Sequence, residues 1–233
     1  MNEIIEAFFQ AVELIVTLDP AVMEIAARSL IISLSATIIA TAIAIPLGFL
    51  IYVHEFTGKK MLINLIQTLY ALPTVIVGLF VFVFISRAGP LGFLGLLFTP
   101  TAMVIAQTVL ILPIMTGLTI SALSGVDPTI RDTIRSLGAN TRQYLALLVR
   151  EARFAILAAV VVGFSRAIAE VGAAIMIGGN TKTSAFWTST RVLTTAISLE
   201  TSMGNIEFSM ALGIILLAIA LVVNLVLMTV QQR

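Results

Sequence analysis

GVDPTIRDTIRSLGANTR (residues 125–142) is a charged, amphipathic stretch set between long apolar runs. Hydrophobic residues make up 59% of the 233-residue chain and charged residues only 11%, whereas a soluble domain has roughly 25% charged residues. A run of about 20 apolar residues crosses the hydrocarbon core of a bilayer. Most of the chain is therefore predicted to lie in the membrane, and residues 125–142 outside it.

Start and stop signals in this stretch predict a helix, a turn and a second helix. Asp127 followed by Pro128 marks a helix start, because an aspartate side chain accepts hydrogen bonds from free backbone N–H groups and proline suits the first turn. Gly138 suits the left-handed backbone that ends many helices. Asn140 or Thr141 can cap the helix that follows. The stretch is thus expected to project as two helices.

Charges of both signs surround one apolar face of the first helix. Ile130, Ile134 and Leu137 recur at i, i+4 and i+7, which places them on that face. A loop lying on the lipid surface is one interpretation, but such loops favour a basic polar face. The mixed charges and the capped turn favour docking into a groove of another protein.

Five runs are long and apolar enough to cross the bilayer, which predicts an all-α membrane protein. They are residues 29–53, 61–86, 101–123, 154–178 and 208–232. Pro73 interrupts the second run and is expected to kink it; a gate or cavity-lining role for Pro73 and Thr74 is the alternative. Residues 3–17 are amphipathic and predicted to form an interfacial helix, with a short sixth span as the alternative.

Lysine and arginine are concentrated in the connections that share one side of the membrane. That side holds eight of them, the other connections hold four, and the eight are Lys59, Lys60, Arg131, Arg135, Arg142, Arg150, Arg153 and Arg233. The more positive side is cytoplasmic. The N-terminus is therefore expected outside, the C-terminus inside, and residues 125–142 in the cytosol.

Several function classes lack the residues they need. The chain has no cysteine, which excludes disulfides and thiolate metal sites. Its single histidine, His54, has no ligand partner nearby, so neither a metal nor another cofactor is expected. Gly58-Lys59 has Val53 where a phosphate-binding loop needs its first glycine. Without a catalytic motif or a basic, aromatic patch, we expect neither an enzyme nor a nucleic-acid partner.

Asp132-Thr133-Ile134 followed by Arg135-Ser136-Leu137-Gly138 resembles the Glu-Ala-Ala, three residues, Gly motif of permease subunits of bacterial ATP-binding cassette importers. In that family the loop is a coupling helix, which seats in a cleft of a separate ATPase subunit. Thr133 and Ile134 depart from the motif. The resemblance implies a coupling region at 125–153, with ATPase-coupling residues Arg131, Asp132, Thr133, Arg135, Gly138 and Glu151.

Residues 166–172 and 176–180 resemble the corresponding segment of oxyanion permeases for molybdate, sulfate and tungstate, and residues 89–103 and 191–201 look most like tungstate permeases. The resemblance implies an N-terminal amphipathic segment (1–20) and a type I importer transmembrane domain (21–233). It also implies a homodimer with two ATPase subunits and an extracytoplasmic oxyanion-binding protein, in the cytoplasmic membrane of a prokaryote. Tungstate is the favoured anion and molybdate or sulfate the alternatives. A stand-alone channel or membrane sensor is the alternative of a different class.

Arg166 and Glu170 lie inside the fourth predicted span. They are four residues apart, so they share a helix face and can pair. A charge at mid-bilayer costs about 2.5–3.5 kcal/mol on insertion scales, which excludes a lipid-facing position. One interpretation is a pair that fixes helix packing; the other is that Arg166 lends positive potential to an anion pathway while Glu170 screens it. Asn180 is expected either to end a helix or to line an outer gate.

Overall fold

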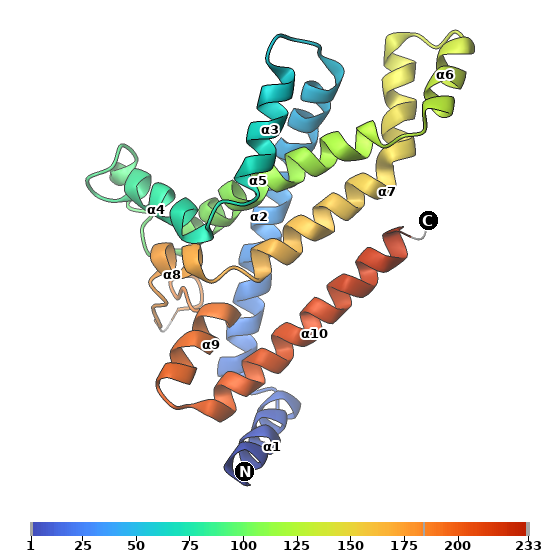
Figure 1. The fold of residues 1–233 in the computed structure, drawn as a ribbon. Helices are drawn as coiled ribbons and strands as arrows, with labels where there is room; N and C mark the ends of the chain where they lie inside the picture. The colour runs from blue at the N-terminus through green and yellow to red at the C-terminus, as the bar shows by residue number, and fades with distance from the viewer. Residues whose placement is uncertain (1, 184, 232–233) are drawn as a thin grey trace.

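The computed structural model describes residues 2–183 and 185–231 (Figure 1). Within these ranges the chain is helical and contains no strand, which confirms the predicted all-α class. The helices are α1 (Asn2–Val16), α2 (Pro20–Val53), α3 (Lys59–Leu69), α4 (Thr74–Ile85), the short 3-10 helix η1 (Gly92–Leu94), α5 (Pro100–Ser124), α6 (Pro128–Ser136), α7 (Thr141–Ile168), α8 (Gly172–Gly178), α9 (Leu193–Ser202) and α10 (Ile206–Gln231).

Three helices of the described chain, α2, α5 and α10, are each long and apolar enough to cross a membrane. They correspond to the first, third and fifth predicted spans; predicted residue 232 lies outside the described residues. With 34 residues, α2 is the longest. It begins nine residues before predicted Ser29, because Asp19 accepts hydrogen bonds from the N–H groups of Ala21 and Val22 and Pro20 occupies the first turn.

The second predicted span is broken rather than kinked. α3 and α4 meet at an angle of 100°, and Pro73 is the residue that precedes α4 rather than one inside a helix. Proline cannot donate a backbone hydrogen bond and disfavours helix at the residue before it. Tertiary packing adds to this, because Tyr70 at the end of α3 lies over Gly117 of α5, where a Cβ atom would be 1.4 Å from the tyrosine Oη. The prediction of one kinked helix is therefore wrong.

The fourth predicted span, residues 154–178, is also divided. α7 is continuous from Thr141 to Ile168, so the predicted second helix of the charged stretch and the span form one helix. The chain then breaks at residues 169–171 before α8. Glu170 stabilises this break, since its Oε1 accepts a hydrogen bond of 2.9 Å from the N–H of Ala173.

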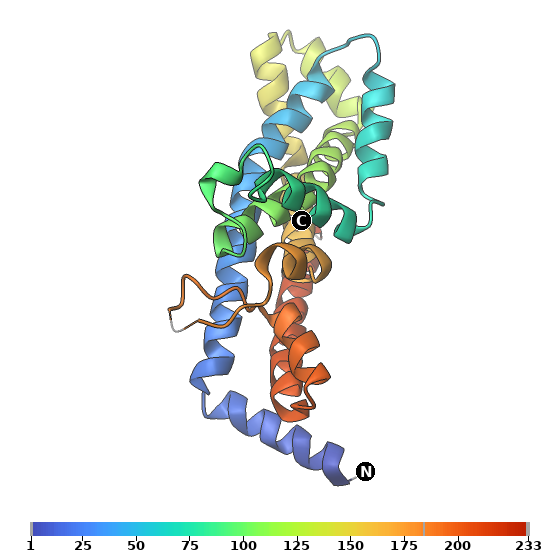
Figure 2. The ribbon, with the colours of Figure 1, turned by 90° about the vertical axis from the view of Figure 1, so that its left-hand side faces the viewer.

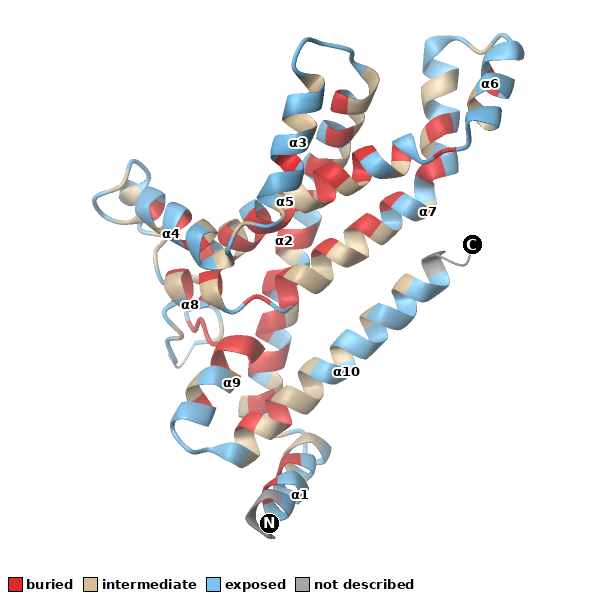
Figure 3. Cartoon of the chain, viewed as in Figure 1, coloured by how far each residue is buried: buried red, intermediate tan, exposed pale blue. Residues whose placement is uncertain are grey.

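Small side chains allow the central helices to approach closely. Ala40 and Ala44 of α2 are fully buried together with Met115 of α5 and Ala167 of α7. Figure 3 shows this buried centre where α2, α5 and α7 cross. A Cβ atom on Gly48 would lie 2.8 Å from the carbonyl oxygen of Thr116. Such small-residue contacts are typical of helix pairs in membranes, where dispersion forces replace the hydrophobic effect.

The end of the fold opposite α6 consists of α1, α9 and the start of α10 (Figure 1). α1 has 15 residues and is about 22 Å long, which is short for a bilayer core of about 30 Å. Figure 2 shows it turned away from the axis of α2. Its Ala11 is buried against α10, whereas Phe8 and Phe9 are exposed. These features fit the predicted interfacial helix better than a sixth span.

Candidate translocation pathway and coupling region

The predicted caps form the projection that carries α6. Asp127 precedes α6 and accepts a 2.7 Å hydrogen bond from the N–H of Thr129, which holds the pKa of this carboxyl below its ordinary value. Gly138 has a φ of +73° and turns the chain. Asn140 and Gln143 then cap α7 reciprocally, each side chain accepting from the other's backbone N–H at 3.0 Å. The helix, turn and helix predicted from these residues are confirmed.

Only part of the predicted apolar face of α6 is covered. Ile134 is buried and Ile130 packs against the core formed by Leu148 of α7 and its neighbours. Leu137 is 81% exposed, so its assignment to the same face is wrong; it lies beyond the last helical residue, where the backbone has left the helical register.

The predicted coupling residues divide between two faces of the projection. Asp132, Thr133 and Gly138 are exposed, and the Thr133 hydroxyl donates to the carbonyl of Thr129 at 2.7 Å. Arg131 and Arg135 line a cavity on the side toward α3. Glu151 lines a separate hollow of about 450 Å³ with Ile130 and Ile134. These residues are therefore brought to one end of the molecule, but not into a single site.

The two broken spans meet at their breaks. Gly172, the first residue of α8, lies against the start of α4, where its Cβ would be 2.8 Å from Cγ2 of Val75 and 3.2 Å from Oγ1 of Thr74. The same position is 3.6 Å from Oε1 of Glu170. The side chain of Pro73, the residue before α4, accepts no hydrogen bond from the first turn. N–H groups of that turn therefore lack a capping side chain. Predicted Thr74 and Glu170 thus lie on either side of Gly172.

Arg166 and Glu170 form the predicted ion pair, with Arg166 Nη1 at 3.6 Å from Glu170 Oε2. The Glu170 side chain is 1% exposed and that of Arg166 is 39% exposed. Glu170 is fixed further by Thr194, whose hydroxyl donates to its carbonyl at 2.7 Å. The pair therefore places an accessible guanidinium next to the junction of the broken spans, held by a buried carboxylate.

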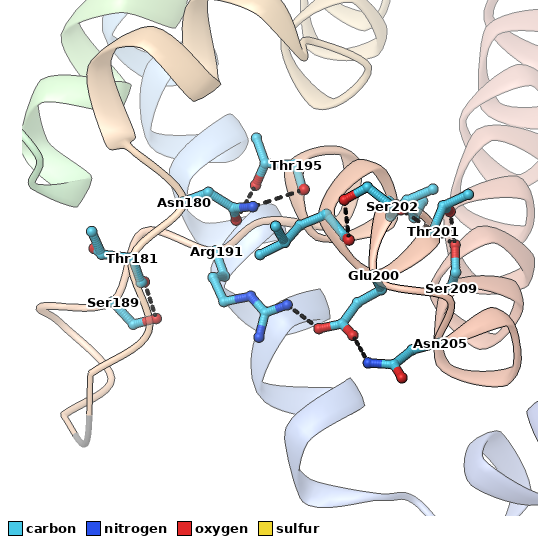
Figure 4. A network of polar contacts seen from close by, with 12 residues as sticks. Asn180, Thr181, Ser189, Arg191, Thr195, Glu200, Thr201, Ser202, Asn205 and Ser209 are labelled. Atoms are coloured by element: carbon cyan, nitrogen blue, oxygen red, sulfur yellow. Dashed lines mark hydrogen bonds and ion pairs between the residues drawn. The ribbon is translucent and has the colours of Figure 1, made fainter.

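Asn180 lies in a different network, shown in Figure 4, which ties the loop between α8 and α9 to α9. Its Nδ2 donates to the carbonyl of Thr195 and its Oδ1 accepts from the Thr195 hydroxyl, both at 3.0 Å. In the same network Arg191 pairs with Glu200, and both are buried. Asn205 donates to the second oxygen of Glu200 at 2.6 Å. The structure does not bring Asn180 to Arg166.

Arg28 is a functional candidate that the sequence did not indicate. It is 2% exposed and donates to the carbonyls of Phe186 at 3.1 Å and Arg191 at 3.0 Å. It also pairs with Glu24 and lies over the Phe186 ring, 4.8 Å from its centre. Arg28 thus holds the outer loop against α2. Its position, just before an uncharged run, was the available signal.

The network around Arg191 and Glu200 borders a cavity of about 730 Å³ between α1, α2 and the 179–207 region. Its lining includes three cations, Arg28, Lys182 and Arg191, and four carboxylates, Glu13, Glu24, Glu200 and Glu207. Because carboxylates are in excess, this cavity is poorly suited to retain an anion. Among the described residues, no cluster of three or more histidine, aspartate or glutamate side chains could hold a metal ion.

Residues 44–233 match the family model described as "Binding-protein-dependent transport system inner membrane component". The chain is 42% identical over 233 residues to the tungstate uptake system permease protein TupB of Peptoclostridium acidaminophilum, covering 100% of both chains. It is 34% identical to TupB of Campylobacter jejuni, covering 97% of this chain and 92% of that one. A probable anion ABC transporter permease protein of Haloferax volcanii is 41% identical over 87% of each chain.

Solved transporters have a similar fold. The chain matches an amino acid ABC transporter with a TM-score of 0.71 and 17% identity, covering 94% of this chain and 96% of that chain. An importer of the acidic polysaccharide alginate gives a TM-score of 0.68 and 18% identity, covering 91% and 79%. The chain therefore belongs to the family of binding-protein-dependent transport system inner membrane components, multi-pass permease subunits of ATP-binding cassette importers whose ATP hydrolysis belongs to a separate subunit.

Proposed function

We propose that this chain is the permease subunit of an importer that passes tungstate across the cytoplasmic membrane. The observation that carries the proposal is the 42% identity, over the whole of both chains, to a tungstate uptake permease. A probable molybdenum permease of Haloferax volcanii and a probable sulfate permease of Chlorokybus atmophyticus are more distant, at 27% and 25% identity. These lower identities make molybdate and sulfate less favoured than tungstate as the transported anion.

The proposed complex contains two copies of this chain, two ATPase subunits and an extracytoplasmic binding protein. The described part of one chain has three complete spans and one bent pair, few for an enclosed route. Two copies about a two-fold axis would enclose one. A stand-alone channel or sensor is disfavoured, because the family model describes a component of a binding-protein-dependent system.

The anion pathway is proposed to run past the junction of the two broken spans. Broken membrane helices are used in transporters to aim free N–H groups at anionic substrates, and α4 begins there without a side-chain cap. Arg166 adds positive charge at the same place, with a side chain that is 39% exposed. Glu170 screens it at 3.6 Å, so an anion would pass without being retained. Asn180 is proposed to act separately, as part of the outer gate.

The projection at 125–153 is proposed to couple the spans to the ATPase. Its exposed groups at the turn, Asp132, Leu137 and Gly138, are available to a partner. Figure 1 shows α6 and the turn before α3 at one end of the fold, with α1 at the other. This separation of the two ends supports the proposal that the lysine- and arginine-rich connections lie in the cytosol and the N-terminus outside.

The test is reconstitution in lipid vesicles with the ATPase and the binding protein encoded for the same importer. Tungstate-loaded binding protein is expected to stimulate ATP hydrolysis and to deliver tungstate into the vesicles. Molybdate and sulfate, each supplied with the same binding protein, measure the selectivity. ATP hydrolysis that never responds to this chain would contradict the permease assignment, whereas stimulation by molybdate or sulfate alone would contradict only the anion.

A further inference from the structure

A second polar cavity, of about 650 Å³, lies on the cytosolic side of the core. It is bordered by the end of α2 and the start of α3, by the last turns of α5, and by α6 and the start of α7. The lining residues come from two parts of the sequence, 52–63 and 120–145, which the fold brings together. The cavity is distinct from the junction of the broken spans and from the hollow that Glu151 lines.

Three cations line this cavity, namely Lys59, Arg131 and Arg135. Its one lining carboxylate, Glu55, is 2.7 Å from Lys59 Nζ, and its side chain is 85% exposed. The cavity therefore has a net positive charge, and its carboxylate is directed largely to solvent.

The two arginines lie one helical turn apart on α6, where like charges repel. Within the described residues, neither arginine forms an ion pair, because no carboxylate oxygen lies within 4.0 Å of its side-chain nitrogens. Arg131 donates from Nη2 to the carbonyls of Leu123 at 3.2 Å and Ser124, but its Nε is buried without a hydrogen-bond partner. A buried donor of a charged group that lacks an acceptor is costly.

Arg135 is held in place by stacking rather than by an anion. Its guanidinium lies over the ring of Tyr144, 5.1 Å from the ring centre, so its N–H groups remain free to donate. Hydroxyl groups of Tyr52, Ser124 and Thr141 border the same cavity. Cationic side chains thus line a space whose one lining carboxylate, Glu55, is exposed and already paired with Lys59, which also donates to the carbonyl of Tyr52 at 2.8 Å.

We infer that this cavity binds a tetrahedral oxyanion. Guanidinium groups match the paired oxygens of such anions with two parallel hydrogen bonds, and the ligand would relieve the repulsion between Arg131 and Arg135. It would also bridge α6 to Lys59 and so fix the coupling region against the spans. The ligand is a free oxyanion or the phosphate of a lipid headgroup. Identifying it as the transported anion rests on the proposed function, whereas binding of inorganic phosphate does not.

The experiment uses the full-length chain purified in detergent without the ATPase, which has anion sites of its own. Thermal unfolding is followed in increasing sodium phosphate or sodium tungstate, with sodium chloride at equal ionic strength as the reference. The Tm is expected to rise with oxyanion and to saturate, since a ligand that binds only the folded state stabilises it. Arg135→Gln is expected to weaken the apparent affinity at least tenfold.

Arg142→Gln is the matched control, because Arg142 is exposed in the first turn of α7 and does not line the cavity. It removes the same charge and is expected to keep the wild-type response. Lys59→Gln is a second variant away from α6, and it is expected to weaken binding as well. If Arg142→Gln loses the rise in Tm to the same extent as Arg135→Gln, the effect is a general one of charge and the proposed site is overturned.

The source of the oxyanion is separated by a second arm in nanodiscs. A rise in Tm that depends on Arg135 and appears in nanodiscs with phosphatidylglycerol, but not with phosphatidylcholine alone, assigns the site to a lipid headgroup. A shift that depends on Arg135 in detergent with phosphate or tungstate assigns it to a free anion. The inference is overturned if neither arm gives such a shift, including the case in which Arg135→Gln impairs only ATPase binding. Uptake is not measured, so the proposed function is tested separately.

Discussion

Gly172 lies directly against Thr74: a Cβ atom at this glycine would be 3.2 Å from the Thr74 Oγ1. The first residue of α8 therefore touches the first residue of α4, and each helix begins just after a break in a span. The absence of a side chain at residue 172 allows the two broken spans to meet next to Arg166 and Glu170.

Gly172→Val is expected to separate α4 from α8 and to abolish most tungstate uptake. The new side chain would overlap Val75, whose Cγ2 would be 2.8 Å from the added Cβ, and overpacking of this kind costs about 1–3 kcal/mol. Gly213→Val on α10 is the control, because a Cβ there has no neighbour within 4 Å. Tungstate uptake in vesicles and the Tm should be measured for both variants. Equal effects of Gly172→Val and Gly213→Val would contradict the prediction.

Arg166→Gln distinguishes an anion pathway from a packing role. The Glu170 carboxylate is 1% exposed and the arginine 39% exposed, so removing the arginine leaves a buried carboxylate unpaired and should cost up to about 3–5 kcal/mol. Uptake is nevertheless expected to fall at least tenfold if the guanidinium faces the moving anion. Uptake at the wild-type rate, in a variant that still inserts but has a lowered Tm, would leave the pair with a packing role only.

Arg191 and Glu200 provide a test of the outer network. Arg191→Met leaves the buried Glu200 without its ion-pair partner, and breaking a buried pair in this way costs about 3–5 kcal/mol. The double variant Arg191→Met/Glu200→Leu should recover much of this loss, because no buried charge remains. Thermal unfolding of the two variants measures the difference. A double variant less stable than the single one would show that the network stabilises the fold by hydrogen bonds rather than by charge pairing.

Gly138→Val is expected to uncouple ATP hydrolysis from uptake while the spans stay inserted. A φ of +73° is unfavourable for a β-branched residue, at a cost of about 1–2 kcal/mol, so the turn after α6 should change shape. Gly95→Val is matched to it, since Gly95 has a φ of +60° in a loop far from α6, and neither glycine has a neighbour within 4 Å of a Cβ.

ATP hydrolysis and uptake should be measured in the same vesicles. Normal hydrolysis with reduced uptake is expected for Gly138→Val alone. An unchanged ratio of uptake to hydrolysis in that variant, or an equal change in Gly95→Val, would remove the coupling role from this turn.

Local signals in the sequence determined much of this structure. Asp127, Gly138 and Asn140 act within a few residues of their own positions, so the ends of α6 and the start of α7 were predicted from the sequence. The pairing of Arg166 with Glu170 was predicted from helical spacing, although Glu170 lies just past the end of α7 at Ile168. The apolar runs gave α2, α5 and α10, because the length of a membrane helix is set by the bilayer and by composition.

Tertiary structure alone decided where the other two spans break. A proline or a glutamate inside an apolar run permits a break, but the 100° turn depends on Tyr70 packing over Gly117, and the second break on α8 meeting α4. Arg28 reaches the carbonyl of Arg191, which is 163 residues away. Such partners carry no local signal, because each forms only when helices distant in sequence are packed side by side.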